Sequence, residues 1–145
     1  MTLTITTPTA PAARDTSLAM RRGWSQCCPA CGKGRMFAGF LKVAPACETC
    51  REELHHQRAD DAPPYFTIFI VGHIVIAGVL WMEKAYQPEA WLHAAIWGPL
   101  TVAMSLWLLP RIKGVLVGLQ WAQRMHGFGG IDPNDPQPTD QSTQG

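Results

Sequence analysis

The chain has 145 residues, a length typical of one compact domain, and its 12 basic and 11 acidic side chains give a formal net charge of +1. This balance argues against a nucleic-acid-binding protein, which normally presents a strongly basic face. Four of the five cysteines stand in two close pairs, a pattern that fits a metal site better than a disulfide framework.

The two ends of the chain have the composition of tails. Residues 1–21 are rich in Thr, Ala and Pro and lack the continuous apolar core of a secretory signal. Residues 129–145 are polar and rich in proline. Segments of this composition do not bury enough apolar surface to fold, so we expect both to be disordered tails.

Residues 22–62 contain the two cysteine pairs. Cys28 and Cys31 form one C-x2-C pair, and after fifteen intervening residues Cys47 and Cys50 form the second. This spacing is typical of a zinc site in which four thiolates complete a tetrahedral shell and leave no open position. The site is therefore expected to be structural. Iron in a rubredoxin-like site would use the same ligands, so the identity of the metal stays open.

The segment between the pairs, residues 33–43, contains glycines and alternating apolar residues, which predicts a short β-hairpin. A unit of about forty residues is too small to be stable on apolar burial alone. A bound metal would have to supply most of its stability, on the order of 10 kcal/mol in comparable zinc fingers. We interpret Cys27 as a bystander, and His55 and His56 as solvent-facing, because four sulfurs already complete the shell.

Two apolar segments follow the cysteine pairs. Residues 65–82 and residues 90–109 each reach the length needed to cross a bilayer core, and aromatic residues lie near their ends. The link between them is short, so residues 63–109 are predicted to form an antiparallel transmembrane hairpin. Two buried helices of a soluble protein are the alternative, but nothing else in the chain would cover them.

The basic residues predict the orientation of this hairpin. Many arginines and lysines precede the first span, and Arg111, Lys113 and Arg124 follow the second, whereas the link contains only Lys84. The positive-inside rule therefore places both termini in the cytoplasm. Cytoplasmic thiols are kept reduced, which agrees with a metal site and disfavours disulfides.

Residues 110–128 begin at a proline and carry apolar residues at helical spacing. We expect either an amphipathic helix at the membrane surface or a kinked continuation of the second span. Gly114 and Gly118 would allow another helix to approach closely, although packing of this segment on its own protein is an equally good interpretation. The fold class is thus a small β zinc-ribbon headpiece, an α-helical two-span hairpin and a C-terminal amphipathic helix.

His73 lies near the middle of the first span, where an ionisable side chain needs a partner. A hydrogen bond to Thr101 or Ser105 would satisfy it, and a role as a cofactor ligand is an equal alternative. We do not expect one haem between His73 and His93 within one copy, because their heights in the hairpin would differ by about 13 Å.

Asp60 and Asp61 precede two prolines, which makes them poor helix caps, since proline disfavours helical geometry before it and lacks an amide hydrogen. Hairpin geometry brings Arg111 and Lys113 to the same level, so weak surface ion pairs are the preferred interpretation. A binding role for the aspartates, or for the two basic residues, is the alternative. The sequence shows no catalytic constellation, so we expect neither an enzyme nor a small-molecule substrate.

Several short motifs follow one another along residues 22–128. They are Cys28-Pro-Ala-Cys31-Gly-Lys-Gly-Arg-Met-Phe, Gly39-Phe-Leu-Lys-Val, Cys47-Glu-Thr-Cys50, Arg58-Ala-Asp-Asp-Ala-Pro-Pro-Tyr-Phe, Lys113-Gly and Gln120-Trp-Ala-Gln-Arg-Met-His-Gly-Phe. Together they resemble a bacterial membrane family known as domain of unknown function 983. One position departs from that family, which usually has glycine where this chain has Arg51.

The resemblance implies a cytoplasmic zinc ribbon joined to two transmembrane helices in the bacterial inner membrane, and it implies no established activity. Genes of similar proteins often lie near those of cytochrome c oxidase and its assembly factors, which hints at a respiratory role. We therefore expect a non-enzymatic accessory protein whose ribbon docks such a membrane-protein partner. A protein that handles a metal or haem through the four cysteines or His73 is the first alternative. A membrane-tethered nucleic-acid or ribosome binder is the second, and the low net charge counts against it.

Overall fold

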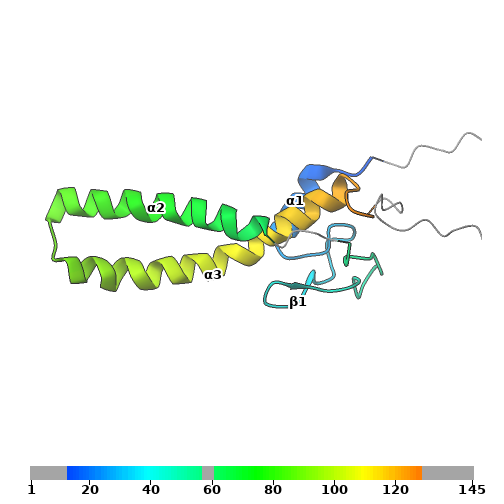
Figure 1. Cartoon of the computed structure of the whole chain (residues 1–145). Helices are drawn as coiled ribbons and strands as arrows, with labels where there is room; N and C mark the ends of the chain where they lie inside the picture. The colour runs from blue at the N-terminus through cyan, green and yellow to red at the C-terminus, as the bar shows by residue number, and fades with distance from the viewer. Residues whose placement is uncertain (1–12, 57–60, 129–145) are drawn as a thin grey trace, which may run out of the picture.

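The computed structural model describes residues 13–56 and 61–128. Figure 1 shows an elongated molecule in which a helical hairpin extends to one side and a headpiece lies at the other end. The elements in chain order are α1 (Thr16–Trp24), β1 (Phe37–Gly39), β2 (Lys42–Val43), α2 (Ala62–Tyr86) and α3 (Ala90–Ala122). The headpiece combines α1, the two strands with their loops, and the C-terminal part of α3.

Helix α1 begins at a well-formed N-cap. The Asp15 carboxylate accepts hydrogen bonds from the Leu18 amide at 3.1 Å and from the Ser17 hydroxyl at 2.8 Å. The prediction of a disordered tail over residues 1–21 is therefore wrong from residue 16 onward, and residues 1–12 lie outside the described residues, as do residues 129–145. Composition missed this helix because nine residues are too few to be stable alone and depend on a partner helix.

That partner is the C-terminal part of α3. Ala19 and Gly23 of α1 face Gly118 and Gly114 of α3, so small residues four positions apart meet on both helices. A Cβ atom at Gly23 would overlap the carbonyl of Gly114, and one at Gly118 would overlap the carbonyl of Ala19. The expected close approach of a helix at these glycines is confirmed, and the chain supplies that helix itself.

The segment between the cysteine pairs forms the predicted hairpin. Strands β1 and β2 are antiparallel, with Phe37 opposite Val43 and Gly39 opposite Lys42. The ribbon does not stand apart from the helices, because it shares one apolar core with the end of α3. The buried residues of this core are Cys28, Met36, Cys47, Leu54, Val117 and Phe128.

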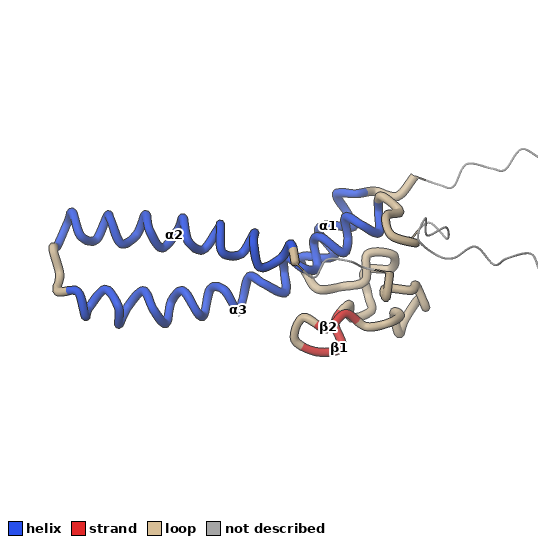
Figure 2. Tube along the Cα trace, viewed as in Figure 1, coloured by secondary structure: helices blue, strands red, loops and turns tan. Residues whose placement is uncertain are grey.

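Helices α2 and α3 run antiparallel, and Figure 2 shows only a short loop between them. Gln87 ends α2 in the left-handed conformation, with φ of 47°. Both helices are long and apolar enough to cross a membrane, and only 11 % and 39 % of their most apolar windows are buried within the structure. Core helices of a soluble protein would be mostly buried, so this exposure favours a membrane protein.

Helix α3 continues without interruption from the predicted second span, through Pro110, to Ala122. In Figure 1 its C-terminal part takes a new direction where it meets α1. The expectation of a separate amphipathic helix over residues 110–128 is thus wrong, and the alternative of a continuation is correct. The physical reason is packing, because α1 and the ribbon core hold the helix together beyond the proline.

Candidate metal centre

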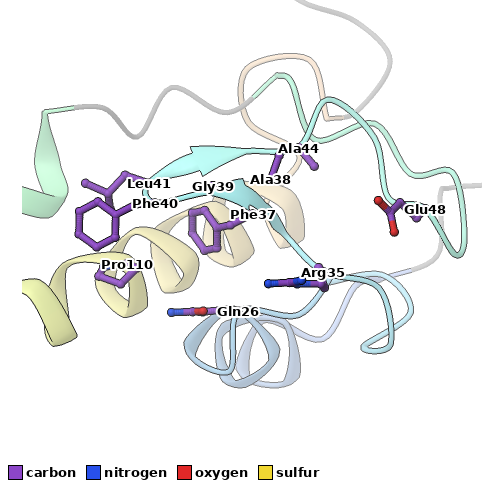
Figure 3. Close-up of a pocket in the computed structure, with 10 residues that line it drawn as sticks. All are labelled: Gln26, Arg35, Phe37, Ala38, Gly39, Phe40, Leu41, Ala44, Glu48 and Pro110. Atoms are coloured by element: carbon purple, nitrogen blue, oxygen red, sulfur yellow. The ribbon is translucent and has the colours of Figure 1, made fainter.

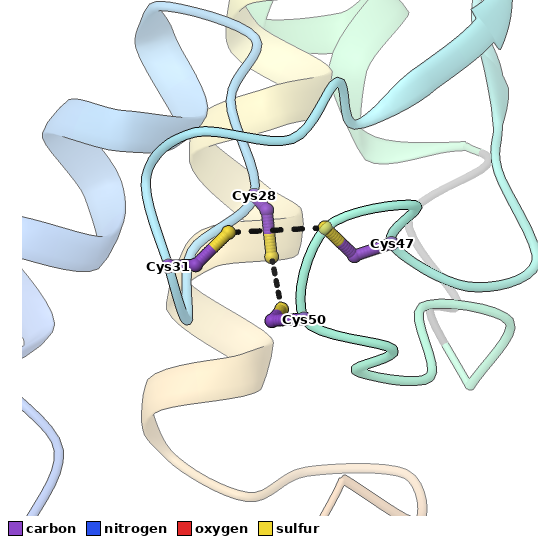
Figure 4. A group of neighbouring side chains, drawn as sticks. All are labelled: Cys28, Cys31, Cys47 and Cys50. Atoms are coloured by element: carbon purple, nitrogen blue, oxygen red, sulfur yellow. Dashed lines mark hydrogen bonds between the residues drawn. The ribbon is translucent and has the colours of Figure 1, made fainter.

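The four cysteines predicted as metal ligands converge on one point, as Figure 4 shows. The Sγ atoms of Cys28 and Cys50 are 3.7 Å apart, and those of Cys31 and Cys47 are 3.8 Å apart. All four sulfurs lie within 4.8 Å of one another. Four sulfurs bound tetrahedrally at about 2.3 Å from a metal ion would be separated by about 3.8 Å. The four side chains therefore fit a tetrahedral metal ion. Each of the two close contacts joins a cysteine of the first pair to a cysteine of the second.

The two cysteine pairs have matching backbone turns. The Gly32 amide donates to the Cys28 carbonyl at 2.8 Å, and the Arg51 amide donates to the Cys47 carbonyl at 2.9 Å. Both donor residues are in the left-handed region, with φ of 70° at Gly32 and 62° at Arg51. Glycine adopts this conformation freely, whereas arginine is disfavoured by about 1–2 kcal/mol. Arg51 thus forms the same turn that Gly32 forms in the first pair, and its backbone is strained there.

The sulfurs differ in how readily they ionise before a metal binds. The Gly34 and Lys33 amides point at the Cys31 sulfur and lower the pKa of this thiol to about 6. Burial raises the pKa of the Cys28 thiol, and burial also raises the pKa of Cys50. Four thiolates this close repel one another, so all four ionise together only around a cation.

A polar network, which the sequence gave no local reason to expect, fastens the second cysteine pair to α3. Trp121 Nε1 donates to Glu52 Oε1 at 2.7 Å, and the same carboxylate oxygen is 3.6 Å from Arg14 Nη2. Arg14 Nη1 also donates to the Trp121 carbonyl at 2.7 Å, and its guanidinium carbon is 4.2 Å from the centre of the Trp121 ring. Because Glu52 is two residues from Cys50, this network ties the metal centre to the helix.

The first cysteine pair is fastened to α1 in a comparable way. Arg22 Nη1 donates to the carbonyls of Pro29 and Ala30, at 2.9 and 2.8 Å, within the turn between Cys28 and Cys31. From the sequence, Arg22 is one of the many basic residues that precede the first span, and nothing local predicts these two bonds. Its position shows that each half of the metal centre is attached to a different helix of the headpiece.

A second group of potential metal ligands lies near Cys50. Glu53, His55 and His56 bring one ligand atom each to within 4.8 Å of the others, and His56 Nε2 is 3.2 Å from Glu53 Oε2. His55 is exposed, as expected, whereas His56 is half-buried with its ring 5.9 Å from that of Phe128. A pocket of about 310 Å³ lies between His56 and Cys50.

His73 does not form either of the predicted hydrogen bonds. Its Nδ1 atom lies 2.7 Å from the carbonyl of Phe69, one turn earlier in α2, and the side chain is exposed. The Thr101 hydroxyl likewise donates to a carbonyl of its own helix, that of Trp97, at 2.6 Å. Local backbone bonds therefore satisfy both residues, and the predicted contact of His73 with Thr101 is wrong. The described part of the chain places no cluster of metal-ligand residues around His73.

The predicted ion pairs have a mixed outcome. Arg111 Nη1 donates to the Trp107 carbonyl at 2.8 Å, and its guanidinium lies 4.0 Å from the centre of the Trp107 ring. Asp61 is exposed and its side chain makes no capping hydrogen bond, as expected, but α2 begins at Ala62, so Asp61 occupies the N-cap position and the proline does not prevent helical geometry before it. Among the described residues no ion pair joins Asp61 to Arg111, so that pairing is wrong. Lys113 is buried, and Asp60 lies outside the described residues, so their pairing stays a prediction.

Comparison with known proteins agrees with these features. A family model described as protein of unknown function (DUF983) matches residues 37–121, which include the strand hairpin, the second cysteine pair and both long helices. The first cysteine pair precedes the matched region. No curated protein and no solved structure matched the chain. Because the family model covers more than half of its length, the chain belongs to the DUF983 family, as its motifs indicated.

Proposed function

We propose that this protein is a non-enzymatic accessory protein of the bacterial inner membrane, whose zinc ribbon docks a membrane-protein partner on the cytoplasmic side. The observation that carries the proposal is the convergence of four sulfurs, all within 4.8 Å of one another and in two contacts of 3.7 and 3.8 Å. Four protein ligands leave no coordination position for a substrate, which supports a structural role for the metal. Zinc is the usual ion in such sites, and iron is the other candidate for the same ligands.

The attachment of the ribbon supports a docking role. The ribbon core includes Val117 and Phe128, and Glu52 bonds Trp121, so the metal-binding unit and the end of α3 are packed as one body. Such a headpiece would hold a partner at a fixed place relative to the two long helices. The family resemblance suggests cytochrome c oxidase or its assembly factors as the partner to test first.

One observation favours a second function, the transfer of a metal ion. Cys50 is exposed and lines one pocket together with Glu53 and His56, two members of the second group of potential ligands. The thiolates of the four cysteines and the imidazole and carboxylate groups nearby are both metal ligands, so an ion released from the first group would meet the second. A structural ribbon should instead release its ion slowly.

Gentle detergent extraction followed by metal analysis and mass spectrometry of the copurifying proteins tests the two functions. We expect one zinc ion per chain, slow loss of zinc to a colorimetric chelator, and a membrane complex that copurifies. Cys28→Ser should abolish metal binding, whereas the matched variant Cys27→Ser should retain it, because Cys27 is outside the cluster. Rapid loss of zinc with no stable partner would favour metal transfer, and a metal-free wild-type chain would refute both.

A further inference from the structure

The tip of the strand hairpin is poorly suited to contact with water. Phe40 and Leu41 join β1 to β2, and 62 % of Phe40 is exposed. Leu41 has φ of 61°, a left-handed conformation that glycine and asparagine adopt far more readily. A bulky apolar residue in a disfavoured conformation indicates that its side chain has a use beyond forming the turn.

The position of the tip suggests what that use is. Figure 2 shows the loop between β1 and β2 directed toward the side of the headpiece from which the long helices extend. In Figure 3, Phe40 and Leu41 lie beside Pro110 at one end of a cavity of about 550 Å³, and Glu48 lies at the other end. Pro110 directly follows the predicted span of residues 90–109. The tip is therefore level with the end of that apolar segment.

Aromatic side chains from other elements lie at the same level. Trp107 of α3 has its ring centre 6.0 Å from that of Trp24, at the end of α1, in an edge-to-face contact. Both rings are partly exposed, and Arg111 lies over the Trp107 ring. Tryptophan and arginine in this arrangement are typical of the boundary between lipid chains and headgroups. This boundary thus includes residues of the headpiece as well as of the span.

We propose that the Phe40–Leu41 tip inserts into the interface of the same membrane that α2 and α3 cross, so that the ribbon lies against phospholipid. The inference rests on the proposed membrane location. Phospholipid is the occupant that fits, because the exposed apolar tip is followed by the exposed Lys42, and Arg111 lies over the Trp107 ring at the same level. Basic groups beside an inserted apolar tip attract anionic headgroups.

Photo-crosslinking in lipid nanodiscs of mixed phosphatidylglycerol and phosphatidylcholine tests the contact directly. Phe40→p-benzoylphenylalanine keeps an aromatic side chain at the tip, and the same replacement at Glu48 serves as the matched control at the far end of the cavity. We expect at least tenfold more phospholipid adduct from position 40 than from position 48. Equal adduct at both positions, or adduct at position 40 only with protein, would overturn the proposal.

A double variant keeps the test independent of the probe. Phe40→Ser with Leu41→Asn should retain zinc, because the tip is outside the metal centre, and asparagine suits the left-handed conformation. In nanodiscs, amide hydrogen exchange in β1 and β2 should become severalfold faster than in the wild type, and unchanged exchange would contradict insertion. If the wild-type chain fails to stay in nanodiscs, the membrane location itself is wrong. If it stays and position 40 gives no lipid adduct, only the inserted tip is wrong.

Discussion

Replacing Arg51 by glycine should make the ribbon bind zinc more tightly. Arg51 has φ of 62°, a conformation that costs a side-chain-bearing residue about 1–2 kcal/mol and costs glycine nothing. Glycine also gives the unfolded chain more freedom, which takes back about 0.4–1 kcal/mol. The net gain is about 0.5–1 kcal/mol. Because folding of the ribbon and metal binding are coupled, this gain corresponds to a roughly two- to fivefold lower dissociation constant for zinc.

Competition with a colorimetric zinc chelator at fixed pH measures this change in the dissociation constant. Gly32→Ala is the control that should change the zinc affinity in the opposite direction. Gly32 has φ of 70°, and a Cβ atom there would lie 2.7 Å from Arg22 Nε. We expect weaker zinc binding for that variant. If Arg51→Gly leaves the affinity unchanged or lowers it, the strain at Arg51 does not oppose metal binding, and the arginine side chain stabilises the turn in another way.

Three further predictions concern the contacts of the headpiece and the ionisation of one cysteine. Trp121→Phe leaves Glu52 without its 2.7 Å donor, so thermal unfolding in detergent should show a loss of about 1–3 kcal/mol while zinc stays bound. Gly114→Ala should separate α1 from α3 and destabilise the headpiece by more than about 1 kcal/mol, whereas Gly98→Ala, with open space around it, should be neutral or slightly stabilising in the same assay. In metal-free protein at pH 7, Cys31 should be the first ligand alkylated by iodoacetamide, because the Gly34 and Lys33 amides lower the pKa of this thiol to about 6, and zinc should block the reaction. Mass spectrometry of the alkylated peptides checks this order.

The four-cysteine cluster was predictable because its signal is local in sequence. A C-x2-C pair places two sulfurs on one turn, and the hairpin between the pairs is short enough to bring Cys28 and Cys31 to Cys47 and Cys50. The long helices were equally predictable, since their apolar length is a property of each segment alone. Both predictions needed no knowledge of which segments touch in the folded protein.

The missed features all depend on contacts between distant segments. Helix α1 has an N-cap at Asp15, but its stability comes from the C-terminal part of α3, where Gly114 meets Gly23 across more than ninety positions of the chain. The bond from Trp121 to Glu52 likewise joins residues 69 positions apart. The contact expected between His73 and Thr101 failed for the opposite reason, because local backbone carbonyls satisfied both side chains first. Sequence patterns indicate local geometry. They do not decide which of several possible hydrogen-bond partners a side chain takes in the folded protein.

These long-range contacts change how the metal centre should be understood. A ribbon connected only through its chain ends would unfold alone when its metal was lost. Here Val117 and Phe128 belong to the same core as the ligands Cys28 and Cys47, and Arg22 bonds the turn of the first cysteine pair. A metal ion bound by the four cysteines would therefore stabilise the packing of α1 and the end of α3 together with the ribbon. Because α3 runs unbroken into the long hairpin, an ion bound by the four cysteines would also fix the direction in which the headpiece leaves that hairpin.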